Sequence, residues 1–400
     1  MKIVVIGAGA SGIVAGICSK RSDNEVIVLE QNKTPLKKLL ITGNGKCNYF
    51  NEDFDIKHYE SSNIDLLKEV ITEDNKKKVL NFMNRIGIIP KIKNGYYYPA
   101  SNQAYTIHNA LLKEASVVGV KVMTDTKVEE IKYNDKFILK TNNEEIICDK
   151  LIISTGSKAY PKTGSTGDGY IFASKLNHKI NEVNPSLVQL TSSNKILKEL
   201  EGVRSDVKVS LYDDKLLKEE TGEIQFTSYG LSGICIYNLS ILLNKTKNPS
   251  VGVKLLSEYI NNYNDFIKLM DLRNNSLKER TITELLESYL NYKIVNALLK
   301  LCKIDNNVKW NELSKDKKEL LGQTLTNLRF DITGTKGYEA SQVCSGGVSL
   351  EDINIKTFES KKIPNLYFTG ELLDVCGECG GYNLGFAFLS GIIVGMNIND

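Results

Sequence analysis

The beginning of the chain holds the feature that most constrains its fold: an apolar strand, a glycine-rich turn and a helix, in that order. The stretch KIVVIGAGASGIVAGICSKR contains the spacing Gly7-x-Gly9-x-x-Gly12 directly after a β-branched run. A second apolar run, NEVIVLEQN, follows and has Glu30 at its end. Three glycines alone would be weak support. Strand, glycines, helix, second strand and terminal acid together predict a Rossmann-type βαβ unit that binds a dinucleotide, and they disfavour an accidental glycine-rich turn.

Each part of this fingerprint has a physical reason. Gly7 permits the tight turn, Gly9 lets the backbone approach a pyrophosphate, and Gly12 lets helix and strand pack closely. The helix N-terminus offers unpaired N–H groups and the positive end of the helix dipole to the phosphates. Glu30 is placed to accept hydrogen bonds from ribose hydroxyls, which favours an unphosphorylated ribose, as in FAD or NAD, over NADP.

The segments that follow favour FAD over NAD. Where a plain NAD domain would continue with its next helix, LKKLLITGNGKCNYFN forms a glycine-punctuated loop whose amides, with Lys38 or Lys46, could wrap the pyrophosphate. Residues 121–156 read as a β-meander with polar turns that returns to a core strand ending in Thr155-Gly156. NLYFTGELLDV, at 365–375, is another buried strand followed by Gly370-Glu371 and Asp374.

With these features the chain resembles the two-domain FAD flavoproteins of the glutathione-reductase and fumarate-reductase kind. More narrowly, it is similar to the bacterial NAD(P)/FAD-dependent oxidoreductases described as BaiN-like or aminoacetone-oxidase-like. The stretches that carry the resemblance run from residue 3 to residue 395 and include the N-terminal fingerprint, KLLITGNGKCN, STGSKAYPKTGSTGDGY, GEIQFTSYGLSG and CSGGVSLEDINIKTFESKKIPNLYFTGELLDVCGECGGYNLGFAFLSG. The C-terminal block is the most specific of them.

The resemblance implies cofactor-binding positions that fall into four groups by the part of the cofactor they would contact. Pyrophosphate and adenosine contacts would come from Gly7, Gly9, Ala10, Ser11, Gly12, Glu30, Gln31, Val128, Thr155 and Gly156. Contacts along the pyrophosphate and flavin side would come from Lys38, Leu39, Gly43, Gly45, Lys46, Cys47 and Asn48. Ribityl and phosphate contacts would come from Gly370, Glu371 and Asp374, and the flavin-facing turn from Gly380, Gly381, Tyr382, Asn383 and Leu384.

The chain also departs from the family pattern. Cys344, Cys376 and Cys379 stand where polar, small or threonine-like residues are expected, so chemistry tuned at the flavin is in question. Ser228 replaces a histidine, which removes support for a mechanism that needs one there, and Ile234 replaces a proline.

The Cys376-x-x-Cys379 spacing leaves three hypotheses open. The first is that the cysteines are small packing residues in a flavin dock, because glycines and an apolar helix follow them and a free cysteine commonly behaves as a small hydrophobe. Such a helix N-terminus would stabilise negative charge on the reduced flavin. The second is a redox-active dithiol pair. The third is a metal or iron–sulfur site that adds Cys47 and Cys344, although the spacing matches no compact ligand motif. We favour the flavin dock.

Composition excludes several classes of function. The 51 basic and 48 acidic residues nearly balance, at a net charge of +3, so we predict no nucleic-acid and no membrane-surface partner. Eight cysteines scattered over 400 residues favour a reducing, cytoplasmic setting over a disulfide framework. Glycines interrupt the N-terminal apolar run, which disfavours a signal peptide, and no segment is apolar enough to span a membrane. Three histidines leave little room for a metal site, so we predict none.

The fold class predicted is α/β, with a Rossmann-like FAD-binding domain interrupted by a β-barrel-like and helical cap. The FAD-binding domain would comprise 1–187 and 337–400, and the cap 188–336, with helices at about 255–322. The helical part has apolar i, i+3, i+4 stripes that favour core packing over a cofactor box. Substrate would bind between the cap and the flavin.

No catalytic residue can be assigned from the sequence. Tyr97, Tyr98 and Tyr382 could donate a proton, but packing is the better interpretation of each. The three histidines, at 58, 108 and 178, lie in helix-like polar segments, and we predict none to be catalytic. Arg204 is a weak candidate for binding a substrate anion.

These features predict an FAD-dependent oxidoreductase with non-covalent FAD that passes hydride through flavin N5 to or from a small or medium organic substrate. Reduction of a conjugated C=C bond in a cyclic enone and oxidation of an amine both remain open. So do an FAD-dependent RNA-modifying protein and a non-catalytic flavin sensor. No second glycine fingerprint follows a strand, so NAD(P)H would act as a transient reductant, or electrons come from elsewhere. Oligomeric state cannot be read from the sequence.

Overall fold

The computed structural model describes residues 1–399, which form two compact units. The first unit comprises Met1–Ser186 and the chain from Ser341 onward, and the second comprises Leu187–Ala340. The second unit is therefore an insertion in the sequence of the first. Each unit has its own hydrophobic core.

A seven-stranded sheet is the centre of the first unit, with strand order β21-β22-β23-β11-β1-β2-β7. Its five neighbouring parallel strands are β23 (Leu366–Phe368), β11 (Lys150–Ile153), β1 (Lys2–Ile6), β2 (Glu25–Leu29) and β7 (Lys121–Met123). The short strands β21 (Ile353–Asn354) and β22 (Glu359–Ser360) extend the sheet antiparallel. The β-branched run at β1 forms the buried middle strand, as expected for a parallel sheet covered on both faces.

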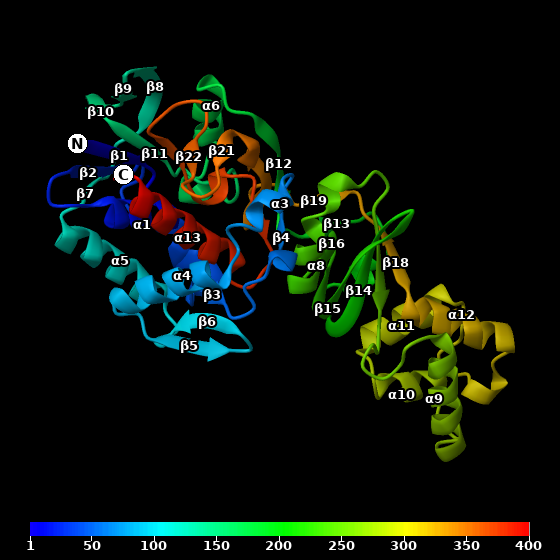
Figure 1. Ribbon diagram of the computed structural model, residues 1–400. Coiled ribbons are helices and arrows are strands. Elements are labelled where there is room, and N and C mark those ends of the chain that lie inside the picture. Colours follow the sequence, from blue (N-terminus) through cyan, green and yellow to red (C-terminus); the bar gives the residue numbers. More distant parts are fainter. Residues whose placement is uncertain (400) are drawn as a thin grey trace. The chain divides into compact units, whose positions relative to one another are not determined.

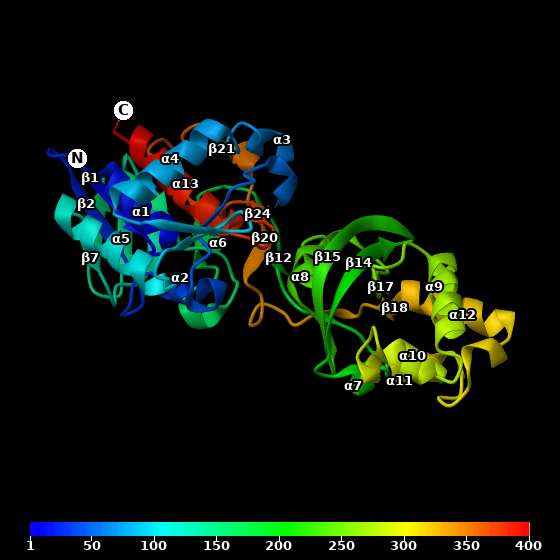
Figure 2. The same ribbon diagram turned by 90° about the horizontal axis from the view of Figure 1, so that it is seen from below.

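The first and last helices of the chain, α1 (Ala10–Ser19) and α13 (Tyr382–Asn397), pack side by side, as Figures 1 and 2 show. Small residues make this close approach feasible. A Cβ atom added at Gly391 of α13 would lie 2.5 Å from the backbone oxygen of Ser11. Helices α4 (Glu73–Arg85) and α5 (Ala104–Val118) pack against α13 and α1, respectively.

Smaller elements surround this core. The predicted meander is confirmed as β8 (Val128–Asn134), β9 (Lys136–Thr141) and β10 (Glu145–Cys148). A three-stranded sheet contains β3 (Phe50–Asn51), β5 (Pro90–Lys93) and β6 (Tyr96–Pro99). Two strand pairs are β4 (Tyr59–Glu60) with β24 (Cys376–Gly377) and β12 (Ile180–Ser186) with β20 (Val343–Val348). The remaining helices of this unit include α2 (Lys37–Ile41), α3 (Ile64–Leu67) and α6 (Asp168–Lys175).

The second unit contains an antiparallel sheet with strand order β18-β17-β14-β15-β16-β13-β19. The strands are β13 (Leu190–Thr191), β14 (Arg204–Asp213), β15 (Lys215–Thr227), β16 (Gly230–Ser232), β17 (Ser250–Lys254), β18 (Leu328–Asp331) and β19 (Gly334–Thr335). Its helices are α7 (Leu197–Leu200), α8 (Ile234–Ser240), α9 (Tyr263–Ser276), α10 (Ile282–Glu287), α11 (Tyr292–Leu301) and α12 (Lys315–Thr326). The predicted helical stripes in this region are thus confirmed, and Trp310 and Phe266 are buried edge to face among these helices.

Among residues 1–399, no helix combines the length and the apolar character that crossing a bilayer would require.

Candidate cofactor site

The glycine turn between β1 and α1 has the geometry that a bound pyrophosphate requires. Gly7 has a φ of 102° and donates its N–H to the Leu29 oxygen at 2.7 Å. Gly9 precedes the ten-residue helix α1, and no side chain caps the N–H groups of the first turn. A Cβ atom at Gly9 would meet no atom within 4 Å, so the space over this turn is open. The turn therefore presents free N–H donors to that space.

Glu30 lies at the end of β2 beside this turn and is 8% exposed. Its Oε2 accepts the Ala8 N–H at 2.9 Å, and its Oε1 accepts the Asn32 N–H at 2.8 Å. Two hydrogen bonds from the backbone fix the carboxylate in place. Asn32 Nδ2 also donates to Oε1 at 2.6 Å, so three of about four lone-pair sites of the carboxylate are used and one remains for a ribose hydroxyl.

Residues from the two ends of the chain meet beside the glycine turn. Ser154 Oγ, at the end of β11, lies 2.7 Å from Ser11 Oγ and accepts a hydrogen bond from Thr369 Oγ1 at 2.8 Å. One residue further, a Cβ atom at Gly370 would overlap Ser11 Oγ, so only glycine fits this contact. The adjacent Glu371 Oε2 pairs with Lys38 Nζ at 2.7 Å. Four of the predicted segments are thereby brought together.

The turn before α13 joins the loop that contains Asn48. Gly381 has a φ of 92°, and a Cβ atom there would lie 2.6 Å from the Phe50 oxygen. Asn51 Nδ2 donates to the Gly380 oxygen at 2.9 Å. The Asn383 side chain closes the turn, because it accepts the Gly377 N–H at 2.8 Å and donates to the Gly377 oxygen at 2.7 Å. No side chain caps α13 either, so its first-turn N–H groups are available to a ligand.

Two buried polar atoms in these segments lack a hydrogen-bond partner among the described residues: Asn48 Oδ1 and Thr155 Oγ1. Each orphaned buried polar atom in a folded protein calls for an explanation. Both residues belong to the predicted cofactor set, and they lie in the segments that flank the two uncapped helix N-termini. A bound dinucleotide, which is rich in hydroxyl, phosphate and amide groups, fits this arrangement of donors and acceptors.

The other predicted positions differ in how open they are. Gly43, Gly45 and Lys46 lie in an exposed or half-buried loop, whereas Leu39 is buried. Cys47 is fully buried, and burial raises the pKa of its thiol to about 12.

Further predicted positions already have protein partners. Gln31 Nε2 donates to the Gly164 oxygen at 2.6 Å. Val128 is buried two residues after Thr126, whose N–H donates to the Glu30 oxygen at 2.9 Å. Asp374 Oδ2 accepts from Ser62 N at 3.0 Å and from Asn181 Nδ2 at 2.7 Å. Gly12 and Ala10 lie in α1, Gly156 follows Thr155 with a φ of 73°, and Tyr382 and Leu384 lie in the first turn of α13.

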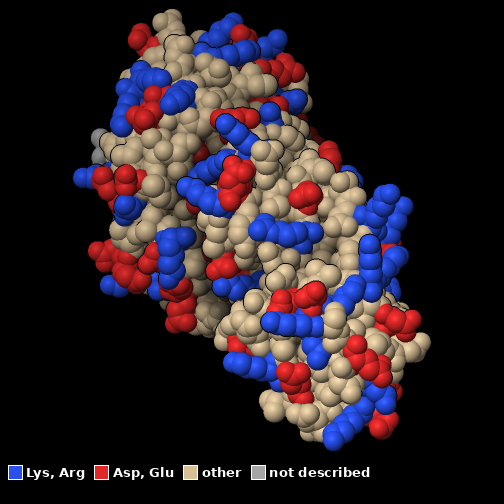
Figure 3. Space-filling view, turned by 90° about the vertical axis from the view of Figure 1, so that its right-hand side faces the viewer, with Lys and Arg blue, Asp and Glu red and all other residues tan. Residues whose placement is uncertain are grey.

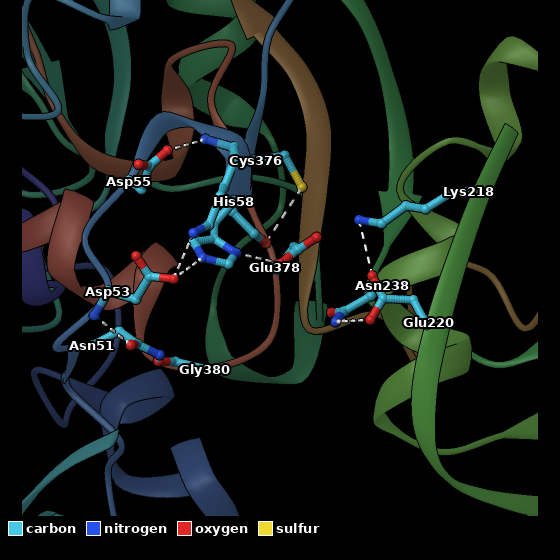
Figure 4. Close-up of polar contacts among 12 residues, drawn as sticks. Asn51, Asp53, Asp55, His58, Lys218, Glu220, Asn238, Cys376, Glu378 and Gly380 are labelled. Carbon is cyan, nitrogen blue, oxygen red and sulfur yellow. Dashed lines mark hydrogen bonds and ion pairs between the residues drawn. The ribbon is translucent and has the colours of Figure 1, made fainter. Parts of the chain in front are cut away.

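Sequence reasoning missed a cluster of charged side chains centred on His58, drawn in Figure 4. His58 Nδ1 lies 2.7 Å from Glu378 Oε2, and Nε2 lies 2.9 Å from Asp53 Oδ2. The imidazole also stacks on the Tyr382 ring at a centroid distance of 4.5 Å. Burial alone would lower the pKa of His58, but hydrogen bonds to Glu378 and Asp53 outweigh it and raise that pKa. His58 therefore ties the 53–60 segment to the turn before α13.

The predicted description of the histidines is wrong in its details. His58 ends a 3₁₀ turn and lies in this charged cluster. His108 lies in α5 but is buried rather than in a polar setting. His178 follows α6, is 4% exposed and bonds Ser360 Oγ at 2.7 Å. Long-range packing decides all three environments.

The second unit has its own polar groups. Lys218 Nζ lies 3.1 Å from Glu220 Oε1, and Asn238 Nδ2 donates to Glu220 Oε2 at 3.3 Å (Figure 4). Arg204, the weak candidate for an anion site, pairs with Glu223 at 2.7 Å and is mostly exposed. Its charge is thus already balanced by a carboxylate.

Comparison with known protein families gives a family match that covers almost the whole chain. The model of the family described as HI0933-like protein Rossmann domain matches residues 1–397. The chain belongs to this HI0933-like family.

Named relatives of this HI0933-like protein cover it from end to end. It is 35% identical over 402 residues to a 3-dehydro-bile acid delta(4,6)-reductase of Clostridium scindens, with 98% of each chain covered. It is 27% identical over 391 residues to a ribosomal RNA dihydrouridine synthase of Escherichia coli, which covers 97% of this chain and 95% of that one.

Among solved structures, a flavocytochrome c3 fumarate reductase in its open conformation matches with a TM-score of 0.50 at 14% identity. The match covers 99% of this chain and 78% of that chain. At this identity the likeness concerns the fold alone. It confirms the predicted α/β fold class of the fumarate-reductase type, and the family match confirms the predicted resemblance.

No disulfide joins the cysteines of this HI0933-like chain among the described residues. Cys376 is 1% exposed, and burial is the main cause that raises the pKa of its thiol well above the usual value. Reactive thiols have the opposite character, a lowered pKa and partial exposure. The environment of Cys376 therefore favours the packing hypothesis over the dithiol.

Proposed function

We propose that this protein is an FAD-dependent oxidoreductase that reduces a carbon–carbon double bond conjugated to a carbonyl group. One observation carries the proposal: the glycine turn before α1 and the turn before α13 each leave a helix N-terminus uncapped, and buried polar atoms without a partner lie in the neighbouring segments. The fumarate-reductase type of fold and the reductase relative at 35% identity support the flavin and the reaction class.

FAD would be held non-covalently by the first unit. The α1 N-terminus with Gly7, Gly9 and Gly12 would hold the pyrophosphate, and Glu30 the adenosine ribose. The segments around Lys38–Asn48, Thr155–Gly156 and Gly370–Asp374 would enclose the rest. We further propose that the FAD-binding domain runs over 1–187 and 337–400 and the cap over 188–336, close to the division of the chain into compact units.

The chemistry needs a hydride for the β carbon and a proton for the α carbon of the conjugated system. FAD, when bound and reduced, supplies the hydride through N5. The N-terminus of α13, with Gly380 and Gly381 allowing close approach, would stabilise negative charge at the pyrimidine edge of the ring. The Asn383 hydrogen bonds to Gly377 keep this turn in one conformation, so the N–H groups are fixed before a ligand arrives.

Conjugated C=C reduction is the reaction that both named relatives share. The name of the first relative describes reduction of double bonds in a 3-dehydro bile acid, and the name of the second describes formation of dihydrouridine in ribosomal RNA. The substrates of the two relatives differ greatly, but the bond that is reduced is in both cases a C=C bond conjugated to a carbonyl group. This shared chemistry supports enone-type reduction over amine oxidation for the present chain.

NAD(P)H is the reductant we propose, as a transient visitor to the flavin. Anaerobic mixing of the yellow protein with NADH and NADPH tests this step through bleaching of the flavin absorbance. Reoxidation by a 3-oxo-Δ4 steroid, a quinone or oxygen then ranks the acceptors. A protein that binds no FAD on reconstitution would contradict the proposal at its root, and reoxidation by oxygen alone would contradict the reaction class.

A second candidate is reduction of uridine in RNA, which the Escherichia coli relative favours. The charge distribution argues against it. The net charge is only +3, and on the face drawn in Figure 3 Lys and Arg are interspersed with Asp and Glu. Many cations are paired, for example Lys208 with Glu219 at 2.6 Å. RNA-binding proteins instead gather basic residues on one surface. Salt-sensitive submicromolar binding of ribosomal RNA in a filter assay would reverse this preference.

We also propose a cytoplasmic location and a small-molecule substrate, with no nucleic-acid or membrane partner. The lack of disulfides among the described residues supports a reducing compartment. A non-catalytic flavin sensor stays as an alternative, and it gains support only if the purified protein is never reduced by NADH, NADPH or a dithionite-linked donor.

A further inference from the structure

Two polar side chains face each other across the β12–β20 pair without a hydrogen-bond partner. Asn184 and Ser345 are directly opposite in the antiparallel register. Side chains at such positions share one face, with Cβ atoms about 5 Å apart. Asn184 Nδ2 and Ser345 Oγ are both buried, and neither has a partner among the described residues. Ser345 as a whole is 7% exposed.

An unpaired amide N–H₂ group and an unpaired hydroxyl on one face are costly in the free protein, because a buried polar group without a partner loses its hydration. Two such groups opposite each other indicate a ligand that both contact. The backbone supports this interpretation. The register shifts between Asn181 and Asn184, so β12 bulges at these residues. Bulges frequently re-aim side chains beside active sites.

The pair lies next to the candidate cofactor segments. A Cβ atom at Gly347, two residues after Ser345, would lie 2.6 Å from the Leu372 oxygen, within the Gly370–Leu372 turn. Strand β20 also packs against β24 (Cys376–Gly377), at the start of the turn that we propose to face the flavin. The β12–β20 pair therefore lies beside two segments of the proposed FAD site, Gly370–Leu372 and the turn that begins at Cys376.

We infer that Asn184 and Ser345 form a donor pair that binds a carbonyl oxygen at the flavin site. The inference rests on the proposed function. Asn184 Nδ2 can only donate, and Ser345 Oγ can donate as well, so the ligand atom is an acceptor. Among residues 1–399 no cationic side chain hydrogen-bonds either group, which favours a neutral carbonyl over a phosphate or carboxylate.

Two ligands could supply this carbonyl: the pyrimidine part of the flavin, or the substrate carbonyl conjugated to the reacting C=C bond. In the second case, the pair would stabilise the negative charge that develops on oxygen when hydride adds to the β carbon. The shared chemistry is a conjugated carbonyl oxygen, and the experiment separates the two sources.

The test compares Ser345→Ala and Asn184→Leu with Ser349→Ala as the control. Ser349 is fully buried, but its hydroxyl has partners, Glu351 N at 3.4 Å and Asn63 Oδ1 at 3.4 Å. Without ligand, Ser345→Ala should keep or raise the melting temperature, because it removes no internal hydrogen bond, whereas Ser349→Ala should lower it. A fall for Ser345→Ala like that of the control would overturn the inference.

Function is measured in two arms: the Kd and reduction potential of FAD, and kcat/KM for a 3-oxo-Δ4 steroid. We expect each variant to lose about fivefold in one arm, the loss of one hydrogen bond. A higher Kd or a shifted reduction potential of FAD assigns the pair to the flavin carbonyl. A lower kcat/KM with unchanged Kd and reduction potential of FAD assigns it to the substrate. No change in either arm overturns the inference. If the wild-type protein reduces no enone, the proposed reaction fails, and the FAD arm alone decides the role of the pair.

Discussion

His58 Nδ1 lies 2.7 Å from Glu378 Oε2 while Nε2 of the same ring lies 2.9 Å from Asp53 Oδ2. Ionised carboxylates only accept hydrogen bonds, so both ring nitrogens must carry a proton for both contacts to be favourable. The geometry therefore calls for the imidazolium form. Glu378 belongs to the turn that we propose to face the flavin, and its N–H also donates to the His58 oxygen at 2.9 Å.

We predict that His58 stabilises the folded protein more at low pH than at high pH. Its pKa in the folded protein is raised, so the stabilisation is fully present below the usual pKa of 6.5 and is lost as pH rises through the raised value. The Glu378 contact contributes most, since Asp53 is 55% exposed and also pairs with Lys57 at 2.9 Å. We expect about 1 kcal/mol in total.

The measurement compares the free energy of unfolding of the wild-type protein and His58→Gln between pH 5.5 and 9. The difference between them should shrink as pH rises, because glutamine does not titrate. His108→Gln serves as a control on the same unit. Parallel pH profiles for the wild-type protein and His58→Gln would mean that folding does not shift the pKa of His58, which would contradict its two carboxylate contacts.

Gly9→Ala should separate cofactor binding from folding. A Cβ atom at Gly9 meets nothing within 4 Å, and the residue has an ordinary φ of −79°. The variant should therefore unfold at the wild-type temperature when FAD is absent. If the pyrophosphate lies over this turn, the added methyl group blocks its approach, and we expect FAD affinity to fall at least tenfold, about 1.4 kcal/mol. Titration of apoprotein with FAD checks this, and wild-type affinity would place the pyrophosphate elsewhere.

Gly391→Ala, unlike Gly9→Ala, should lower the stability of the protein in the absence of FAD. The added Cβ atom would lie 2.5 Å from the Ser11 oxygen and 3.0 Å from the Ala15 nitrogen, both backbone atoms of α1. Helices α1 and α13 would have to move apart, at a cost of about 1–3 kcal/mol, the usual range for overpacking. Chemical denaturation of the apoprotein measures the loss. Stability equal to that of Gly9→Ala would contradict the close packing of the two helices.

The local part of this fold could be predicted from the sequence, because its causes are local. The β1–turn–α1–β2 order depends on glycines and apolar residues within about one βαβ unit, and the meander on alternating residues between polar turns. The same holds for α9 and α11, whose apolar stripes are visible in the chain.

The contacts that shape the site could not be predicted, because they join residues far apart in the chain. His58 and Glu378 are 320 positions apart and meet through β4 and β24, strands of two residues each that leave no periodic pattern. Asn184 and Ser345 become neighbours through a register shift that no propensity encodes. Family resemblance predicted where the cofactor segments lie, but not which polar atoms lack partners.

The cysteine pair gives the last prediction. Cys376 is buried with a raised pKa, while Cys379 is half-buried. In the native protein, Cys376 should react with a thiol alkylator far more slowly than in denaturant, since thiolate is the reactive form. Cys376→Ala and Cys379→Ala should each keep at least half of the wild-type rate at which an enone acceptor reoxidises the reduced flavin. Mass spectrometry after timed alkylation and anaerobic stopped-flow measure the two quantities. A dithiol mechanism would instead require both variants to lose turnover while the flavin still bleaches, because electrons would reach the flavin but not leave through the thiols.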